Sequence, residues 1–148
     1  MNIYRVSLRL LLIFFFSVLL FSCSRDIGQV PPGETITYPA EGVMTINGKE
    51  LRTDLAILPG GKVQRWGPWD NHSIGSEELE EIFTEQVKVL IIGTGYEDGA
   101  FLTPEGANYV DKIKQQGVTV HVLATQEAVK LFNSLPKTGL LACFHLNC

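Results

Sequence analysis

The chain has 148 residues, with 12 Lys and Arg against 16 Asp and Glu, and a formal net charge of −4. This length is enough for one domain with its own hydrophobic core and too short for two. The negative charge argues against nucleic acid as a partner, because binding phosphates requires a basic surface.

Residues 1–22 have the pattern of a secretory signal peptide. Arg5 and Arg9 precede an apolar stretch over residues 10–20, which is interrupted only by Ser17 and is too short for a membrane-spanning helix. The segment Leu20-Phe21-Ser22-Cys23 then resembles the bacterial lipobox, which predicts cleavage before Cys23 and lipidation of its thiol. The alternatives are a simple signal peptide with an incidental cysteine, or an uncleaved anchor.

A lipidated Cys23 predicts a lipoprotein anchored to a membrane, since several acyl chains, such as palmitate, hold a protein stably on a bilayer. Ser24 after the cysteine, by analogy with bacterial lipoproteins, indicates the outer membrane and a domain that faces the periplasm. The redox state of Cys143 and Cys148 stays open. An extended chain would separate them by about 16 Å, so a disulfide would require a sharp reversal.

Residues 23–37 are predicted to be a lipidated N-terminus and linker, and residues 38–148 a single domain. The domain begins with β patterns. Val43–Ile46 precedes the turn dipeptide Asn47-Gly48, apolar residues alternate over 51–57, and a third strand covers 63–66. These segments predict an antiparallel meander.

Helix and strand patterns alternate in the second half. Ser76 is the expected N-cap of a short helix, and the apolar run 87–95 predicts a strand buried on both faces. A loop to Leu102 then leads to a second helix, for which Thr103 and Pro104 mark the start and Gly117 the end. A strand over 118–123, a third helix and a last strand over 140–146 complete a βαβαβ half, with Thr125 as the expected cap of the third helix and Pro136 as its end.

Several segments together resemble the adipogenesis-associated Mth-type domain family, which includes a mitochondrial complex I assembly factor. They keep their order over residues 38–148 and are Leu58-Pro59-Gly60-Gly61, the loop from Trp66 to Ser73, residues 90–95, residues 120–129, residues 133–135 and the ending 144–148. The resemblance implies a three-layer α/β domain with a mixed sheet, whose last strand runs antiparallel to its neighbours. It implies no established catalytic activity and no cofactor, and it points to an interaction or assembly protein. The leader distinguishes this chain from the soluble members, so their intracellular roles are not transferred.

The carboxyl end of the central strand is the first candidate site, because ligands of open α/β sheets collect there. Gly93, Thr94 and Gly95 occupy this end, but the next glycine, Gly99, gives a spacing unlike a dinucleotide fingerprint. The favoured reading is that the glycines let the chain leave a crowded sheet.

Reactive side chains form the second candidate. His72, His145 and Cys148, with Asp70, would suit an activated thiolate or a zinc site if they converged. An antiparallel last strand would instead place His145 and Cys148 at the opposite end of the sheet from Gly93, so no catalytic or metal residue is assigned. His145 is then a sheet residue with a satisfied hydrogen bond, and Cys148 a buried or capped thiol.

Trp66 and Trp69 lie in the loop between the meander and the first helix. They could cover the core or contact a partner, since tryptophan is enriched at interface hot spots. The sequence thus predicts a lipid-anchored interaction or assembly module that binds an unidentified protein through Trp66, Trp69, Asp70, His72 and the loop from Gly93. The alternative is an enzyme or ligand binder that uses the same edge with His72 and Asp70.

Overall fold

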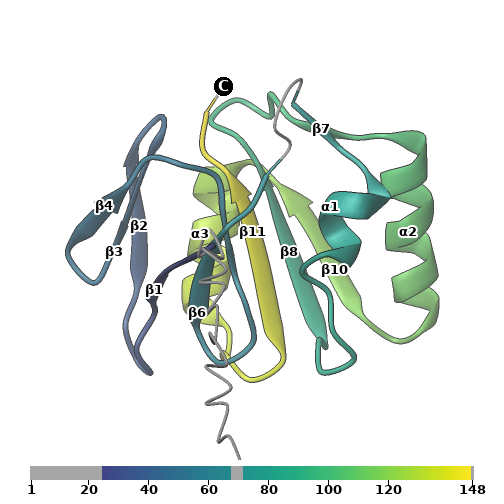
Figure 1. Ribbon diagram of the computed structural model, residues 1–148, viewed down its shortest axis with the longest axis horizontal. Coiled ribbons are helices and arrows are strands. Elements are labelled where there is room, and N and C mark those ends of the chain that lie inside the picture. Colours follow the sequence, from purple (N-terminus) through teal and green to yellow (C-terminus); the bar gives the residue numbers. More distant parts are fainter. Residues whose placement is uncertain (1–24, 68–71, 148) are drawn as a thin grey trace, which may run out of the picture.

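The computed structural model describes residues 25–67 and 72–147. The predicted signal peptide, Cys23, Trp69, Asp70 and Cys148 therefore lie outside the described residues. The chain forms an α/β fold around one mixed sheet of six strands, shown at the centre of Figure 1. In spatial order these strands are β1 (Asp26–Gln29), β6 (Lys62–Arg65), β5 (Leu55–Ile57), β11 (Leu140–His145), β8 (Val89–Thr94) and β10 (Thr119–Leu123).

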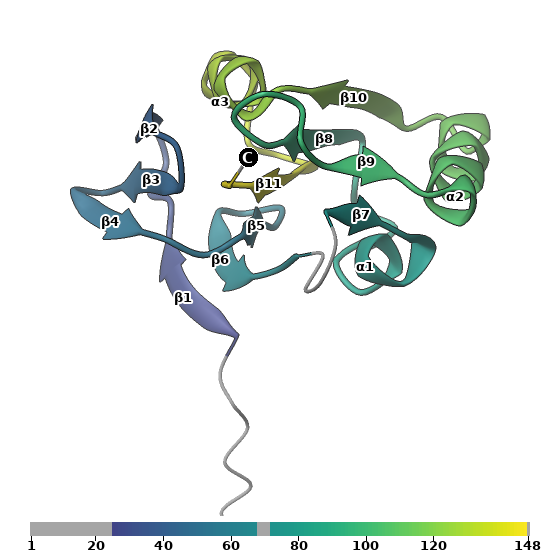
Figure 2. The ribbon, with the colours of Figure 1, turned by 90° about the horizontal axis from the view of Figure 1, so that it is seen from above.

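Strand β8 is the interior strand that the apolar run predicts. Ile91 belongs to a core cluster shared with α3 (Thr125–Ser134), whereas Leu90 and Ile92 belong to a second cluster shared with α1 (Ser76–Glu80) and α2 (Pro104–Gln115). Figure 2 shows α3 and α1 on opposite sides of the sheet. Because both faces are covered by helices, the strand needs apolar side chains at consecutive positions and not only at alternate ones.

The predicted direction of the last strand is wrong. Strand β11 pairs in parallel with β8, from Leu140 beside Val89 to His145 beside Thr94, and only its pairing with β5 is antiparallel. The physical reason is the connection through α3, because a strand, a covering helix and a returning strand of one sheet form a parallel crossover. The same rule correctly predicts the parallel pairing of β8 with β10. His145 and the loop after Gly93 consequently lie at one end of the sheet, the upper end in Figure 1.

The expected meander is divided between two sheets. A separate three-stranded sheet contains β2 (Ile36–Ala40), β3 (Val43–Ile46) and β4 (Lys49–Leu51). Its hairpin turn is the predicted one, with Asn47 at φ 50° and Gly48 at φ 73°. The predicted single strand over 51–57 is interrupted, because residues 52–54 carry the chain from this sheet to β5. Asp54, the last of them, bonds to the end of β11.

The expected linker over residues 23–37 is also wrong where the structure describes it. Asp26–Gln29 forms β1 and pairs with β6 at the sheet edge, while Val30 and Ile36 are buried in the core. Strand β1 is only four residues long and is followed by Pro31, Pro32 and Gly33, so the sequence of this segment predicts irregular structure.

The helix boundaries agree with the sequence in one case and differ in two. Thr103 caps α2 by accepting a hydrogen bond from Gly106 N at 3.1 Å, as predicted. Helix α1 is capped at Gly75, not Ser76, and the Glu78 carboxylate accepts from Gly75 N at 2.9 Å. Helix α3 has Ala124 as its N-cap, which leaves the Thr125 hydroxyl for a different role. Within the described part of the chain, none of the helices has the length and apolar character needed to cross a membrane.

Candidate functional site at the carboxyl ends of β8 and β11

Thr125 joins the ends of β8 and β11 to the start of α3. Its buried hydroxyl donates to the carbonyl of His145 at 2.6 Å and accepts from Gly95 N at 3.0 Å. Its own backbone N–H donates to the Gly95 carbonyl at 2.8 Å. The sequence predicts that Thr125 caps the helix. Its hydroxyl instead forms hydrogen bonds with backbone groups at the ends of β8 and β11. The carboxyl edge of the sheet is therefore held rigidly by a buried side chain.

The loop after β8 is fixed by Thr94. The Thr94 hydroxyl lies 2.7 Å from Asp98 Oδ1 and 3.0 Å from the Leu123 carbonyl, which ends β10. Asp98 has a φ of +59°, which lets its side chain turn back to Thr94. Gly93, Thr94 and Gly95 are all buried, so the exposed part of this loop is Tyr96 to Asp98.

Asp54 and His145 form a hydrogen-bonded pair beneath this edge. Asp54 Oδ2 lies 2.6 Å from His145 Nδ1, and Oδ1 accepts from Leu146 N at 2.9 Å. The His145 side chain is 4% exposed and that of Asp54 is 13% exposed. Since an ionised carboxylate only accepts, the proton of the neutral imidazole lies on Nδ1, which makes Nε2 the basic nitrogen. The sequence predicts a sheet histidine with a satisfied hydrogen bond, and the structure confirms this.

His72 lies against the same pair. Its ring centroid is 5.1 Å from that of His145, and the two rings are inclined at 48°. The exposed His72 immediately precedes β7 (Ser73–Ile74), which pairs in parallel with β9 (Phe101–Leu102), and the His72 carbonyl accepts from Phe101 N at 2.8 Å. The structure thus brings together the two histidines that the predicted topology separates.

Three aromatic residues lie on the segments that end at this edge of the sheet or pair with its chains. The Tyr38 hydroxyl donates to the Leu146 carbonyl, and the Tyr38 ring lies 6.4 Å from that of Tyr96. Burial raises the pKa of Tyr38, and the nearby Glu41 and Asp54 carboxylates add to this shift. Tyr96 is 41% exposed and Phe101 is 58% exposed. We call the surface of Tyr96, Phe101 and His72 the aromatic edge.

The other predicted site residues have different positions. Trp66 is 2% exposed, and its indole N–H donates to the Glu78 carbonyl at 2.7 Å, so it covers the core and is not a surface contact. Trp69, Asp70 and Cys148 lie outside the described residues. Asp54, Tyr38 and Thr125 were missed as site residues. Asp54 occupies a polar position of the alternation over residues 51–57, as Arg52 does, and its partner His145 is distant in sequence.

The chemistry of this arrangement is that of an oriented imidazole. An aspartate that holds one nitrogen of a histidine prepares the other nitrogen for proton transfer or hydrogen bonding. Within residues 25–67 and 72–147, no three His, Cys, Asp or Glu side chains are grouped in a way that could hold a metal ion.

Comparison with known proteins identifies relatives of the whole fold. A family model described as a protein of unknown function (DUF498/DUF598) matches residues 36–144. A conserved hypothetical protein from Pyrococcus horikoshii is 31% identical and has a TM-score of 0.67, and the match covers 78% of this chain and 100% of that protein.

Two further solved structures share the fold at lower identity. A Bordetella pertussis protein described as a Mth938-like domain is 20% identical with a TM-score of 0.60, over 82% of this chain and 92% of that one. A Bartonella henselae protein described as an outer membrane protein is 16% identical with a TM-score of 0.57, over 84% and 96%. The Mth-type resemblance of the sequence is thereby confirmed, whereas these comparisons do not bear on adipogenesis or complex I.

Proposed function

The chain belongs to the DUF498/DUF598 family of unknown function, and we propose that it is a lipid-anchored periplasmic module that binds a protein partner through the aromatic edge. The observation that carries this proposal is the exposure of Phe101 and Tyr96, 58% and 41%, on backbone that hydrogen bonds hold in place. Exposed aromatic side chains on a fixed backbone cost little entropy on binding and are typical of interface hot spots.

The polar groups beneath the aromatic edge support the same function. His72 is exposed and can form hydrogen bonds with a partner, while His145 and Asp54 hold the neighbouring chain end in place. A pattern of aromatic residues with a few oriented polar groups matches the composition of protein interfaces.

In this proposal, the lipid that attaches the protein to the membrane is carried by Cys23. Strand β1 begins at Asp26, three residues later, so the lipidated terminus would join the fold without a flexible spacer. Three extended residues span at most about 11 Å, which would hold the domain close to the bilayer. Ser24 directs the anchor to the outer membrane in this proposal.

The anchor is tested by replacing Cys23 with Ala in the full chain and fractionating cells. We expect an unprocessed and unlipidated precursor. A Cys23→Ala protein of mature size that still sediments with membranes would contradict lipidation.

The binding surface is tested by chemical crosslinking of the full chain in cells. We expect Phe101→Ser to abolish a crosslinked species that the wild type forms. Val122 supplies a matched control, because it is also a large apolar side chain, 42% exposed, on the edge strand β10. If Val122→Ser removes the species and Phe101→Ser does not, the aromatic edge is not the interface.

A second candidate function, an enzyme or small-ligand binder, is favoured by one observation. Asp54 and His145 are paired at 2.6 Å at the sheet edge where ligands of α/β proteins bind. A small molecule that raises the melting temperature of the wild type but not of His145→Gln or His72→Ala would support it. If Phe101→Ser removes the crosslink and His145→Gln retains it, the interaction module is the better description.

A further inference from the structure

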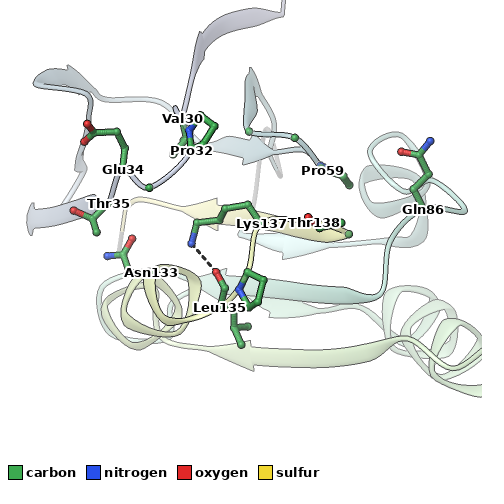
Figure 3. A pocket seen from close by; sticks show the side chains of 15 residues that line it. Val30, Pro32, Glu34, Thr35, Pro59, Gln86, Asn133, Leu135, Lys137 and Thr138 are labelled. Atoms are coloured by element: carbon green, nitrogen blue, oxygen red, sulfur yellow. Dashed lines mark hydrogen bonds between the residues drawn. The ribbon is translucent and has the colours of Figure 1, made fainter.

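A cavity lies at the opposite end of the sheet from the aromatic edge. It has a volume of about 670 Å³, within the range of small-molecule sites. Three segments, residues 30–35, 59–61 and 133–139, form its walls together with Gln86 (Figure 3). Leu140, which follows the cavity residue Gly139, lies five residue steps before His145, which corresponds to roughly 17 Å along β11. The cavity is therefore distinct from the candidate site described above.

Hydrogen bonds fix the walls of the cavity in advance. Asn133 is bound to Ile36 twice, since its Oδ1 accepts from Ile36 N at 3.0 Å and its Nδ2 donates to the Ile36 carbonyl at 2.8 Å. On the other side, Val30 N donates to the Gly61 carbonyl at 2.8 Å. Gly61 permits this approach, because a Cβ there would lie 2.4 Å from the Val30 carbonyl oxygen. Binding of a ligand would therefore cost little conformational entropy, because these walls are already ordered.

Lys137 is the cation of this cavity. Its ammonium donates to the carbonyls of Phe132 and Leu135, the latter at 3.0 Å, and lies 4.0 Å from the centroid of the Phe132 ring. These contacts use two of its three N–H bonds. Among the described residues, no carboxylate lies within ion-pair distance of Lys137. Burial lowers the pKa of Lys137, as expected for an ammonium that lacks a counter-ion.

The remaining lining is mainly apolar. Val30, Pro32, Pro59, Leu135 and Pro136 supply it. Glu34, the acidic residue of the lining, is exposed and can remain hydrated, and Figure 3 shows it on the wall beyond Lys137. The partly desolvated charge of the cavity is thus positive, which favours an anion over a cation as the polar group of a ligand.

We propose that this cavity binds a small amphipathic monocarboxylate, whose carboxylate pairs with Lys137 and whose apolar chain packs against Pro32, Leu135 and Pro136. A single lysine acts as a point charge and suits a singly charged head group. The apolar walls supply the rest of the binding free energy through burial of the ligand chain.

The proposal can be tested on the chain from Ser24 to Cys148. Both core clusters lie within residues 27–146, and the family model matches residues 36–144. The probe is sodium octanoate, titrated by calorimetry, with octanamide and octylamine as neutral and cationic counterparts. Amide chemical shifts locate the binding.

We expect octanoate to shift the amides of residues 33–35 and 137–139, and Lys137→Met to weaken its binding by about tenfold or more, the value of one charge-assisted hydrogen bond. Lys137→Arg should restore most of the affinity. Lys130→Met is the matched control, because Lys130 lies on α3, which ends at Ser134 shortly before Lys137, and its side chain is 71% exposed and paired with Glu127. It should bind octanoate as the wild type does.

Thr138→Trp provides a second variant that leaves Lys137 unchanged. Thr138 is exposed at the cavity wall, so a larger side chain there should obstruct the cavity without disturbing the core. Equal affinity for octanamide and octanoate, unchanged binding by both Lys137→Met and Thr138→Trp, or shifts confined to other residues would overturn the proposal. Phe101→Ser should leave octanoate binding unchanged, so this test is independent of the proposed partner site.

Discussion

Replacing Asp54 with Ala should destabilise the fold strongly, because this one carboxylate satisfies two groups at the end of β11. It accepts hydrogen bonds from His145 Nδ1 at 2.6 Å and from Leu146 N at 2.9 Å, and its side chain is 13% exposed. Hydrogen bonds to charged groups contribute about 1.5–3 kcal/mol each. The loss of both is partly offset because a partly buried charge is removed, so we expect a decrease of about 3 kcal/mol.

This loss would be a large share of the stability of an ordinary domain. It can be measured by guanidinium unfolding of the full chain in a mild detergent, followed by circular dichroism. Asp111→Ala is the control, since Asp111 forms only an exposed ion pair with Lys114 and should cost less than about 0.5 kcal/mol. If Asp54→Ala costs no more than Asp111→Ala, the described network does not hold the end of β11.

Asp54→Asn distinguishes the hydrogen bond to Leu146 N from the hydrogen bond to His145 Nδ1. The amide oxygen can still accept from Leu146 N, but the amide nitrogen must then face His145 Nδ1. The imidazole would carry its proton on Nε2, and nitrogen-15 spectra of the ring would report the change of tautomer. An unchanged tautomer in Asp54→Asn would show that Asp54 does not orient His145.

Three further substitutions test the central strand and its neighbours, each by unfolding measurements. Gly93→Ala should cost about 1–3 kcal/mol by overpacking, because its Cβ would lie 2.8 Å from Thr125 Oγ1 and 2.9 Å from Phe144 Cδ1. Gly28→Ala, where the nearest atom is 4.0 Å away, should be nearly neutral. Thr125→Val removes the donor to His145 and the acceptor for Gly95, and should cost about 2–4 kcal/mol, whereas Ser134→Ala, at an exposed hydroxyl of the same helix, should cost little. Burial raises the pKa of Cys143 above its ordinary value of 9.0. The unfolded chain therefore loses this proton first, and stability should fall above about pH 9 by up to roughly 1.4 kcal/mol per pH unit, a slope that Cys143→Ala should lack.

Local signals in the sequence predict the elements whose structure depends on nearby residues. The apolar run of β8 is explained by burial on both faces, and the start of α2 by the Thr103 hydroxyl and Pro104. The Asn47-Gly48 turn similarly follows from the positive φ that both residues accept. In each case the deciding interaction lies within a few residues.

The site depends on contacts between residues that are distant in sequence. Asp54 and His145 are 91 positions apart, and nothing near either residue indicates the other. Their meeting follows from the antiparallel pairing of β11 with β5, which places Leu55, next to Asp54, opposite Phe144, next to His145. The family resemblance did not predict the parallel pairing of β11 with β8, but the crossover rule applied to α3 predicts this direction and places His145 at the same end of the sheet as Thr94. Thr125 is also decided by distant residues. Its sequence context predicts a helix cap, but its hydroxyl forms hydrogen bonds with Gly95 N and the His145 carbonyl.

The central claim is that the carboxyl edge of β8 and β11 is the binding face of this protein. It is tested most directly by incorporating a photocrosslinking amino acid at position 101 or at position 122 of the full chain, expressed in cells. We predict a discrete crosslinked partner from position 101 and none from position 122. The same partner from position 122 with nothing from position 101 would place the interface at β10 and contradict the account.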